Sequence, residues 1–228
     1  MDFALRLWTD GLSSGDARSG GLQVNAPLLI ATRNFGKLEE LRQLLSDLPF
    51  DLYGLERFPA VERIPETGES FIENASLKAV GYATQTRLLT LADDSGLAVD
   101  ALDGGPGVFS ARYAGEQASD VERATKLLAE LSRVASPKRR ARFVSAVAIA
   151  SSKGQILNVS VGTCDGQIGF APRGSAGFGY DPIFIPIGYE QTFAELKPGI
   201  KNRISHRARA LLTAREFLRT LTITSGDS

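Results

Sequence analysis

The stretch from residue 28 to residue 48 narrows the possible folds of this chain more than any other. A short apolar run, residues 28–31, leads into a polar loop, residues 32–37, and the leucines that follow recur at helical spacing. This order predicts a buried strand, a loop and an amphipathic helix. Such an opening is typical of α/β folds, in which helices cover the faces of a sheet.

The rest of the chain continues this alternation and then departs from it. Helices are predicted to begin at three serines that can cap a helix N-terminus: Ser70, with the capping-box partner Glu73, Ser119 and Ser205. Further strands are predicted at residues 88–92, 142–150 and 156–163, and residues 49–59 form a less regular link. Because the last two strands form a hairpin, we expect an α/β fold with a mixed sheet.

One domain accounts for residues 27–222. The segment before it, residues 1–26, is rich in glycine and serine and lacks a long apolar run, which predicts a flexible N-terminal tail and not a cleaved signal peptide. Residues 223–228 are predicted to be a short C-terminal tail.

Charge and cysteine content exclude several classes of protein. The 26 basic and 26 acidic residues of this 228-residue chain cancel, so a broad cationic surface for nucleic acid is not expected and any phosphate ligand should be small. The one cysteine, Cys164, can form neither an intrachain disulfide nor a zinc cluster, which favours a cytoplasmic location. No apolar run approaches the roughly 18 residues that would cross a membrane.

A first group of candidate site residues lies in the polar loop after the first strand. Backbone amides at the start of a helix attract anions, and side-chain donors here would add to that attraction. The loop comprises Thr32, Arg33, Asn34, Phe35, Gly36 and Lys37. The alternative is an asparagine cap followed by a solvated lysine.

A second group is acidic. Asp93 and Asp94 are adjacent at the end of a predicted buried strand, and such neighbours repel one another unless a cation compensates them. Magnesium binds one or two carboxylates together with substrate phosphates, and Glu66 could supply a further oxygen. Asn74 and Lys78, four residues apart on one helical face, would suit phosphate oxygens. The alternatives are an ordinary turn at residues 93–96 and a solvated helix face.

A third group lies in the last fifty residues. In the sequence Gly177-Phe178-Gly179-Tyr180-Asp181-Pro182, the glycines permit close backbone approach and the rings could stack on a nucleobase. Lys201 and the only histidine, His206, flank the start of the last helix, where the helix dipole favours a neutral imidazole. A tight aromatic turn and an incidental histidine are the alternatives.

Six motifs in this order resemble the inosine triphosphate pyrophosphatase family, the noncanonical purine triphosphatases of the dITP/XTP type. They are residues 32–37, 66–68, 71–75, 92–97 (Ala-Asp-Asp-Ser-Gly-Leu), 178–182 and 205–207 (Ser-His-Arg), and the resemblance spans residues 28–218. The tail before Pro27 is the clear departure from the family.

The resemblance implies an elongated α/β structure with two lobes, a central substrate cleft and a homodimer. It implies that Asp94 accepts a proton and binds Mg²⁺, with Glu66 and Asp93 as further metal ligands. It assigns the triphosphate to residues 32–37 and substrate contacts to Ser95, Phe178, Gly179, Tyr180, Asp181, Lys201, His206 and Arg207. Lys37, Lys78 and Lys201 would neutralise phosphate charge.

The expected reaction is hydrolysis of dITP, ITP or XTP to the monophosphate and pyrophosphate, which clears them from the nucleotide pool. Arg207 and amides near Phe178 would recognise the 6-keto oxygen of the base. Two alternatives remain open: a Maf-like pyrophosphatase of pyrimidine or modified triphosphates, and a nucleotide sensor without activity.

Overall fold

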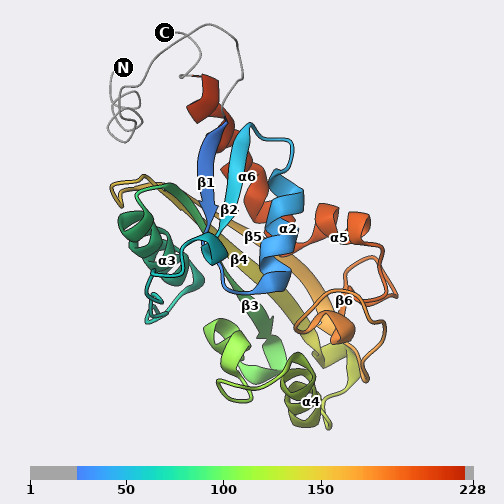
Figure 1. Ribbon diagram of the computed structural model, residues 1–228. Coiled ribbons are helices and arrows are strands. Elements are labelled where there is room, and N and C mark those ends of the chain that lie inside the picture. Colours follow the sequence, from blue (N-terminus) through green and yellow to red (C-terminus); the bar gives the residue numbers. More distant parts are fainter. Residues whose placement is uncertain (1–24, 224–228) are drawn as a thin grey trace, which may run out of the picture.

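The computed structural model describes residues 25–223 (Figure 1). The strands are β1 (Ala26–Ile30), β2 (Phe50–Gly54), β3 (Leu89–Val99), β4 (Arg140–Ala150), β5 (Ile156–Ile168) and β6 (Phe184–Pro186). The α-helices are α2 (Phe35–Leu45), α3 (Phe71–Thr86), α4 (Asp120–Glu130), α5 (Pro198–Ile204) and α6 (His206–Ile223). The 3₁₀ helices are η1 (Leu55–Arg57), η2 (Asp100–Leu102), η3 (Gly107–Arg112), η4 (Ser136–Lys138) and η5 (Asp181–Ile183). The predicted tails lie outside the described residues, apart from residues 25, 26 and 223.

The strands form one mixed sheet in the order β2-β1-β3-β4-β5-β6. β1 pairs in parallel with β2 and β3, whereas β3, β4, β5 and β6 pair antiparallel. The mixed α/β sheet predicted from the sequence is thus confirmed. Within residues 25–223, no helix combines the length and the apolar character needed to cross a membrane.

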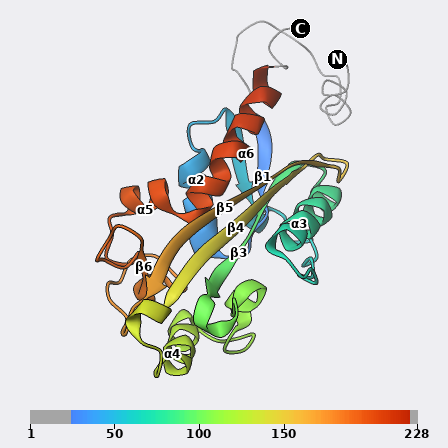
Figure 2. The ribbon, with the colours of Figure 1, turned by 180° about the vertical axis from the view of Figure 1, so that it is seen from behind.

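Strand alternation divides the core between the two faces of the sheet. Leu91 of β3 belongs to the apolar cluster formed with α2 and α6, whereas its neighbour Ala92 belongs to the cluster formed with α3. Figure 2 shows α6 crossing β4 and β5 on the first of these faces. Gly162 permits this close approach, because a Cβ there would lie 2.2 Å from the backbone nitrogen of Ala210. Each fully buried leucine in these clusters stabilises the fold by about 1.5–3 kcal/mol.

A third apolar cluster fills the other end of the sheet and forms a second lobe. It joins the far ends of β3, β4 and β5 to α4, and it includes the rings of Phe143, Phe184 and Phe193, which pack against one another. Cys164 is buried in this cluster as a packing residue. The long strands β3, β4 and β5 pass through both lobes, so the molecule is elongated (Figure 1).

The helix starts follow the capping signals of the sequence. Asn34, Ser70 and Ser119 cap α2, α3 and α4, each accepting a hydrogen bond from a backbone N–H in the first turn. At α4 the capping box is complete. At α3 only half of the predicted box forms, because the Glu73 carboxylate accepts from the backbone N–H of Glu69 instead of Ser70.

Two sequence expectations are wrong, and one short helix was not expected. β3 does not end before Asp93 but continues through residues 93–96, where it pairs with residues 144–147 of β4. The predicted irregular link contains the edge strand β2, which pairs with β1 and buries Phe50. Lys201 lies in this helix, α5, which precedes α6.

Candidate active site

The cleft lies beside the part of β3 that no longer pairs with β1. β1 pairs with β3 only as far as Ile30 and Leu91, and residues 92–96 of β3 have no strand partner on that side within the part of the chain described. Ser110 of η3 binds the edge again at the backbone N–H of Leu97, 2.9 Å away. The gap between these two points opens on a cavity of about 310 Å³, lined by residues from both lobes.

Most of the predicted site residues line this cavity, which brings together the three groups identified in the sequence. Those lining it are Thr32, Arg33, Asn34, Lys37, Glu66, Lys78, Asp94, Ser95, Phe178, Gly179, Tyr180, Asp181, Lys201, His206 and Arg207. Those not among the lining residues are Phe35, Gly36, Asn74 and Asp93. Arg63, Ser110, Asp120 and Arg123 also line it and were not predicted from the sequence.

The loop after β1 forms one wall. Asn34 of this loop is the N-cap of α2, as the alternative interpretation of the sequence predicted. Its Oδ1 accepts a hydrogen bond from the Lys37 backbone N–H at 3.0 Å. The Lys37 side chain is nevertheless not solvated, since its Nζ lies 2.8 Å from Asp93 Oδ2 and is mostly buried. Phe35 points to solvent and is 75% exposed. Gly36 leaves room for the Phe178 ring, because a Cβ at this position would lie 2.5 Å from it.

The two adjacent aspartates project from opposite faces of β3. Asp93 faces α2 and α6, as Leu91 does, whereas Asp94 faces α3, as Ala92 does. Asp93 therefore lies apart from the carboxylates of Asp94 and Glu66 that were expected to join it around a metal ion. The interactions of each aspartate are distinct.

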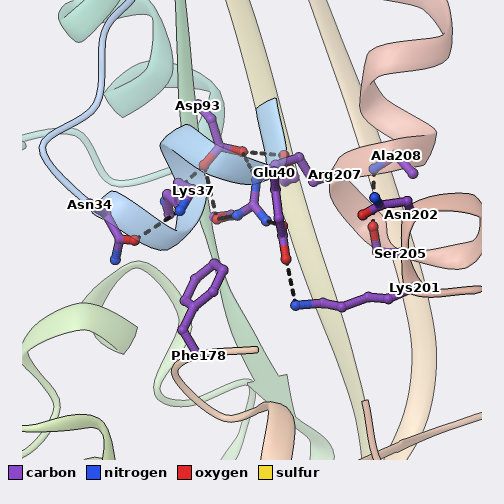
Figure 3. A network of polar contacts seen from close by, with 12 residues as sticks. Asn34, Lys37, Glu40, Asp93, Phe178, Lys201, Asn202, Ser205, Arg207 and Ala208 are labelled. Atoms are coloured by element: carbon purple, nitrogen blue, oxygen red, sulfur yellow. Dashed lines mark hydrogen bonds and ion pairs between the residues drawn. The ribbon is translucent and has the colours of Figure 1, made fainter. Parts of the chain in front are cut away.

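Asp93 is completely surrounded by donors (Figure 3). Its oxygens lie 2.8 Å from Lys37 Nζ, 2.5 Å from Ser145 Oγ, 3.1 Å from Ser95 Oγ and 3.4 Å from Arg207 Nε. Burial opposes ionisation, but Arg207 and Lys37 outweigh it and hold the pKa of Asp93 well below its usual range. Asp93 is thus a fixed anion that joins β3, α2 and α6.

Asp94 and Glu66 converge on one ammonium group. Lys78 Nζ lies 2.8 Å from Asp94 Oδ1 and 2.8 Å from Glu66 Oε1. Burial raises the pKa of Asp94 against the pull of Lys78, which Asp94 shares with Glu66. Burial likewise opposes ionisation of Glu66, but Lys78 and Lys37 hold the Glu66 pKa below its usual value. Two carboxylates from separate segments therefore share one cation at the cavity wall.

Asn74 supports this arrangement from behind. Its Oδ1 accepts from the Gly68 backbone N–H at 2.8 Å and so fixes the loop that carries Glu66. The Asn74 side chain is buried, and its Nδ2 has no hydrogen-bond partner. Its predicted phosphate contact is not supported by its position, because it faces the loop and not the cavity.

A second group of side chains at the cavity is aromatic and ionic, and Figure 3 shows Phe178, Lys201, Glu40 and Arg207 among them. Lys201 Nζ lies 2.5 Å from Asp181 Oδ2, 2.6 Å from Glu40 Oε1 and 4.9 Å from the centre of the Phe178 ring. Glu40 also forms an ion pair with Arg207, which is 1% exposed. Glu40 was not expected from the sequence, although it lies on α2 three residues after Lys37 and hence on the same helical face.

His206 and Arg207 complete this group. The His206 ring stacks on Phe143 at 4.6 Å, and its buried Nδ1 has no hydrogen-bond partner. Burial, followed by the nearby Arg207 charge, holds the pKa of His206 well below 6.5, so the imidazole is neutral as predicted. Arg207 Nη2 donates to Ser95 Oγ at 2.9 Å.

Comparisons with known proteins match most of this chain. The Ham1 family model matches residues 28–217. The dITP/XTP pyrophosphatase of Bacillus anthracis is 48% identical over 185 residues, which are 81% of this chain and 92% of the relative. That of Geobacter sulfurreducens is 49% identical over 191 residues, 84% of this chain and 96% of the relative. A HAM1 protein structure from Coxiella burnetii has a TM-score of 0.77 and 42% identity, covering 86% of this chain and 99% of that one.

Proposed function

Because the chain belongs to the Ham1 family, we propose that this cleft cleaves dITP, ITP and XTP between the α- and β-phosphorus atoms, releasing the monophosphate and pyrophosphate. The chain is a nucleoside triphosphate pyrophosphatase of noncanonical purine nucleotides, and the resemblance found in the sequence is confirmed. The observation that carries the site assignment is the convergence of Asp94 and Glu66 on Lys78, beside Lys37, in a cavity partly lined by aromatic rings.

The donor set fits Mg²⁺. Among residues 25–223 there is no group of three or more acidic, histidine or cysteine side chains that could hold a metal ion, but Asp94 and Glu66 present carboxylate oxygens to one point. Magnesium typically takes one or two carboxylates and completes its shell with water and substrate phosphate. We assign Asp94 and Glu66 as its ligands and Asp93 as an anchor. When bound, Mg²⁺ would draw negative charge from the phosphate oxygens.

Residues of the chain itself supply the base, the phosphate contacts and the nucleoside contact. Asp94 is the base that orients and deprotonates the attacking water, as the resemblance to the family implies, and it lines the cavity beside Lys78. Lys37 and Lys78 bind phosphate oxygens by moving from their carboxylate partners. Lys201 lies with Glu40, Asp181 and Phe178 in the aromatic and ionic group, so we assign it to the nucleoside instead of the phosphates.

Base recognition belongs to the aromatic and ionic group. Phe178 offers a ring face to the purine, and Arg207 offers N–H donors for the 6-keto oxygen that adenine lacks. Glu40, Ser95 and Asp93 hold the Arg207 guanidinium in one position, and His206 Nδ1 is a further polar atom in need of a partner. Such a fixed donor set rejects a base that leaves it unsatisfied.

The two alternatives are less well supported. The relatives carry the name dITP/XTP pyrophosphatase, which favours a purine substrate over the pyrimidine substrates of Maf-like proteins. A sensor without activity would not need Asp94, Glu66 and Lys78 assembled at one point. We further propose that the protein is cytoplasmic, because the nucleotide pool that it clears lies there. The resemblance to the family implies a homodimer, which light scattering after size-exclusion chromatography tests.

Phosphorus NMR of the products from ITP tests the reaction. Monophosphate and pyrophosphate are expected, and diphosphate with orthophosphate would contradict the proposed bond cleavage. Asp94→Asn should lower kcat about 10²- to 10⁴-fold, the range for losing a general base. The matched control is Asp165→Asn, which should retain activity. It changes an exposed aspartate of β5 that forms an ion pair with Arg142 of β4. A panel of dITP, ITP, XTP, ATP and GTP measures base preference, and equal turnover of GTP would refute it.

A further inference from the structure

The first turn of α4 reaches across to the aromatic loop. Asp120, the first residue of α4, lines the cavity, and its Oδ2 accepts from the Gly179 backbone N–H at 2.6 Å. The two residues are 59 positions apart in the sequence. An acidic residue in the first turn ordinarily stabilises its own helix through the helix dipole, but this carboxylate also binds a loop outside the helix.

Arg123 fixes the direction of the Asp120 carboxylate. Arg123 Nη2 forms an ion pair with Asp120 Oδ1, which leaves Oδ2 for Gly179. Arg123 Nη1 donates to the carbonyl of Ala111 at 3.0 Å and to that of Ala118. The guanidinium thereby joins Asp120 to η3 and to the segment before α4, so the oxygen that faces the loop has a defined position.

The loop is held from both lobes of the molecule. On the α4 side, Asp120 binds Gly179, and the Tyr180 hydroxyl donates to the Ser110 carbonyl at 2.9 Å. On the α2 side, the Phe178 ring packs over Gly36. Gly179 has a φ of +63°, which glycine adopts without strain, so the backbone N–H can turn toward Asp120. The hydrogen bond at Gly179 is therefore the backbone restraint next to Phe178 on the α4 side.

We propose that Asp120, oriented by Arg123, is a positioning residue that sets the Phe178 ring for stacking on the purine. The proposal rests on the proposed function, which assigns this loop to the base. Because the Asp120 carboxylate binds Arg123 and Gly179, and not Asp94, Glu66 or Lys78, loss of Asp120 should weaken substrate binding more than it slows the chemical step.

The test compares Asp120→Ala, Asp120→Asn and Glu122→Ala. Asp120→Asn keeps an acceptor oxygen for Gly179. Glu122→Ala is the matched control, because it removes the capping box of the same helix and touches no residue of the loop. We expect Asp120→Ala to raise the KM for dITP about tenfold, equivalent to about 1.4 kcal/mol, with kcat changed by less than about threefold. Asp120→Asn should recover most of the affinity, and Glu122→Ala should leave KM unchanged.

Hydrogen exchange gives a readout that does not require activity. Amide exchange in a peptide covering residues 177–181 should be at least about tenfold faster in Asp120→Ala than in the wild type, and unchanged in Glu122→Ala. Unchanged exchange in Asp120→Ala, or a KM increase equal to that of Glu122→Ala, would overturn the proposal. If the wild type releases no pyrophosphate from dITP but the exchange result holds, the proposed function fails and the positioning contact stands.

Discussion

Replacing Lys78 by methionine should convert a protein that is stable without metal into one that depends on Mg²⁺. The Lys78 ammonium is the cation that Asp94 and Glu66 share, 2.8 Å from each. Methionine keeps much of the packing volume but removes the charge. Asp94 and Glu66, with side-chain exposures of 9% and 24%, would then lose the one cation that pairs with both, although Arg112 would remain 3.6 Å from Glu66 Oε2.

The expected loss follows from these exposures. Removing one partner of a buried ion pair costs about 3–5 kcal/mol, and the partial exposure of Glu66 reduces this to about 2–3 kcal/mol. For a domain of this size, that loss corresponds to a Tm decrease of about 4–12 °C. Mg²⁺ should restore much of it in the variant, since a ligand at 100 times its Kd stabilises by about 2.7 kcal/mol. In the wild type, Lys78 already occupies the position between the two carboxylates, so Mg²⁺ alone should change Tm little.

Calorimetry with EDTA or Mg²⁺, without nucleotide, measures this. Lys138→Met, at an exposed lysine outside the cavity, is the control and should respond to Mg²⁺ as the wild type does. Adding Glu66→Gln to Lys78→Met should abolish the Mg²⁺ response. The reasoning is refuted if Mg²⁺ raises the Tm of the wild type as much as that of Lys78→Met, or if the variant is as stable as the wild type in EDTA.

Two further predictions concern stability. The folded state keeps His206 neutral below pH 6.5 while the unfolded chain takes up a proton there, so stability should fall with decreasing pH by up to about 1.4 kcal/mol per unit. His206→Gln should flatten this slope in urea unfolding between pH 5 and 6.5; an unchanged slope would assign it to other groups. Gly162→Ala should destabilise by about 3 kcal/mol, the upper end for overpacking, because its Cβ would meet the α6 backbone at 2.2–2.3 Å. Gly199→Ala in α5, with open space around the new Cβ, should instead stabilise by about 0.5–1 kcal/mol, and equal urea midpoints for the two would contradict the packing argument.

The parts of the fold that the sequence predicted are those determined by short-range contacts. Asn34, Ser70 and Ser119 mark the starts of three helices, because a cap bonds to amides only two or three residues away. The extent of β3 depends instead on pairing with β4, about fifty residues later, and Asp93-Asp94-Ser95-Gly96 is also a common turn sequence. Local signals therefore favoured a turn where the partner strand imposes an extended chain.

The lack of long-range information in local sequence signals also explains which site residues could be predicted. The loop after β1 and Lys37 could be predicted as site residues from the sequence, because they lie directly between one strand and the first turn of one helix. Glu40 looks like an ordinary polar residue of α2, and only the fold brings Lys201 and Arg207 to it from more than 160 positions away. Asp120 is similar, since its sequence context predicts a helix start and gives no sign of Gly179.

Asp93 and Asp94 show that the alternation of side chains between the two faces of a strand affects the chemistry of the site. If residues 93–96 formed a turn, the carboxylates of Asp93 and Asp94 could both bind one metal ion. That shared cation would then offset the repulsion between them. In a strand, they point to opposite faces, and each meets its own cations: Lys37 and Arg207 for Asp93, Lys78 for Asp94. Asp93 keeps the buried Arg207 and Ser145 beside it when a phosphate draws Lys37 away, whereas the ion-pair partner of Asp94 is Lys78, a lysine at the cavity wall. The repulsion between the two aspartates is therefore resolved without a metal ion, and Asp94 is the one that we expect to lose its ion-pair partner completely during the reaction.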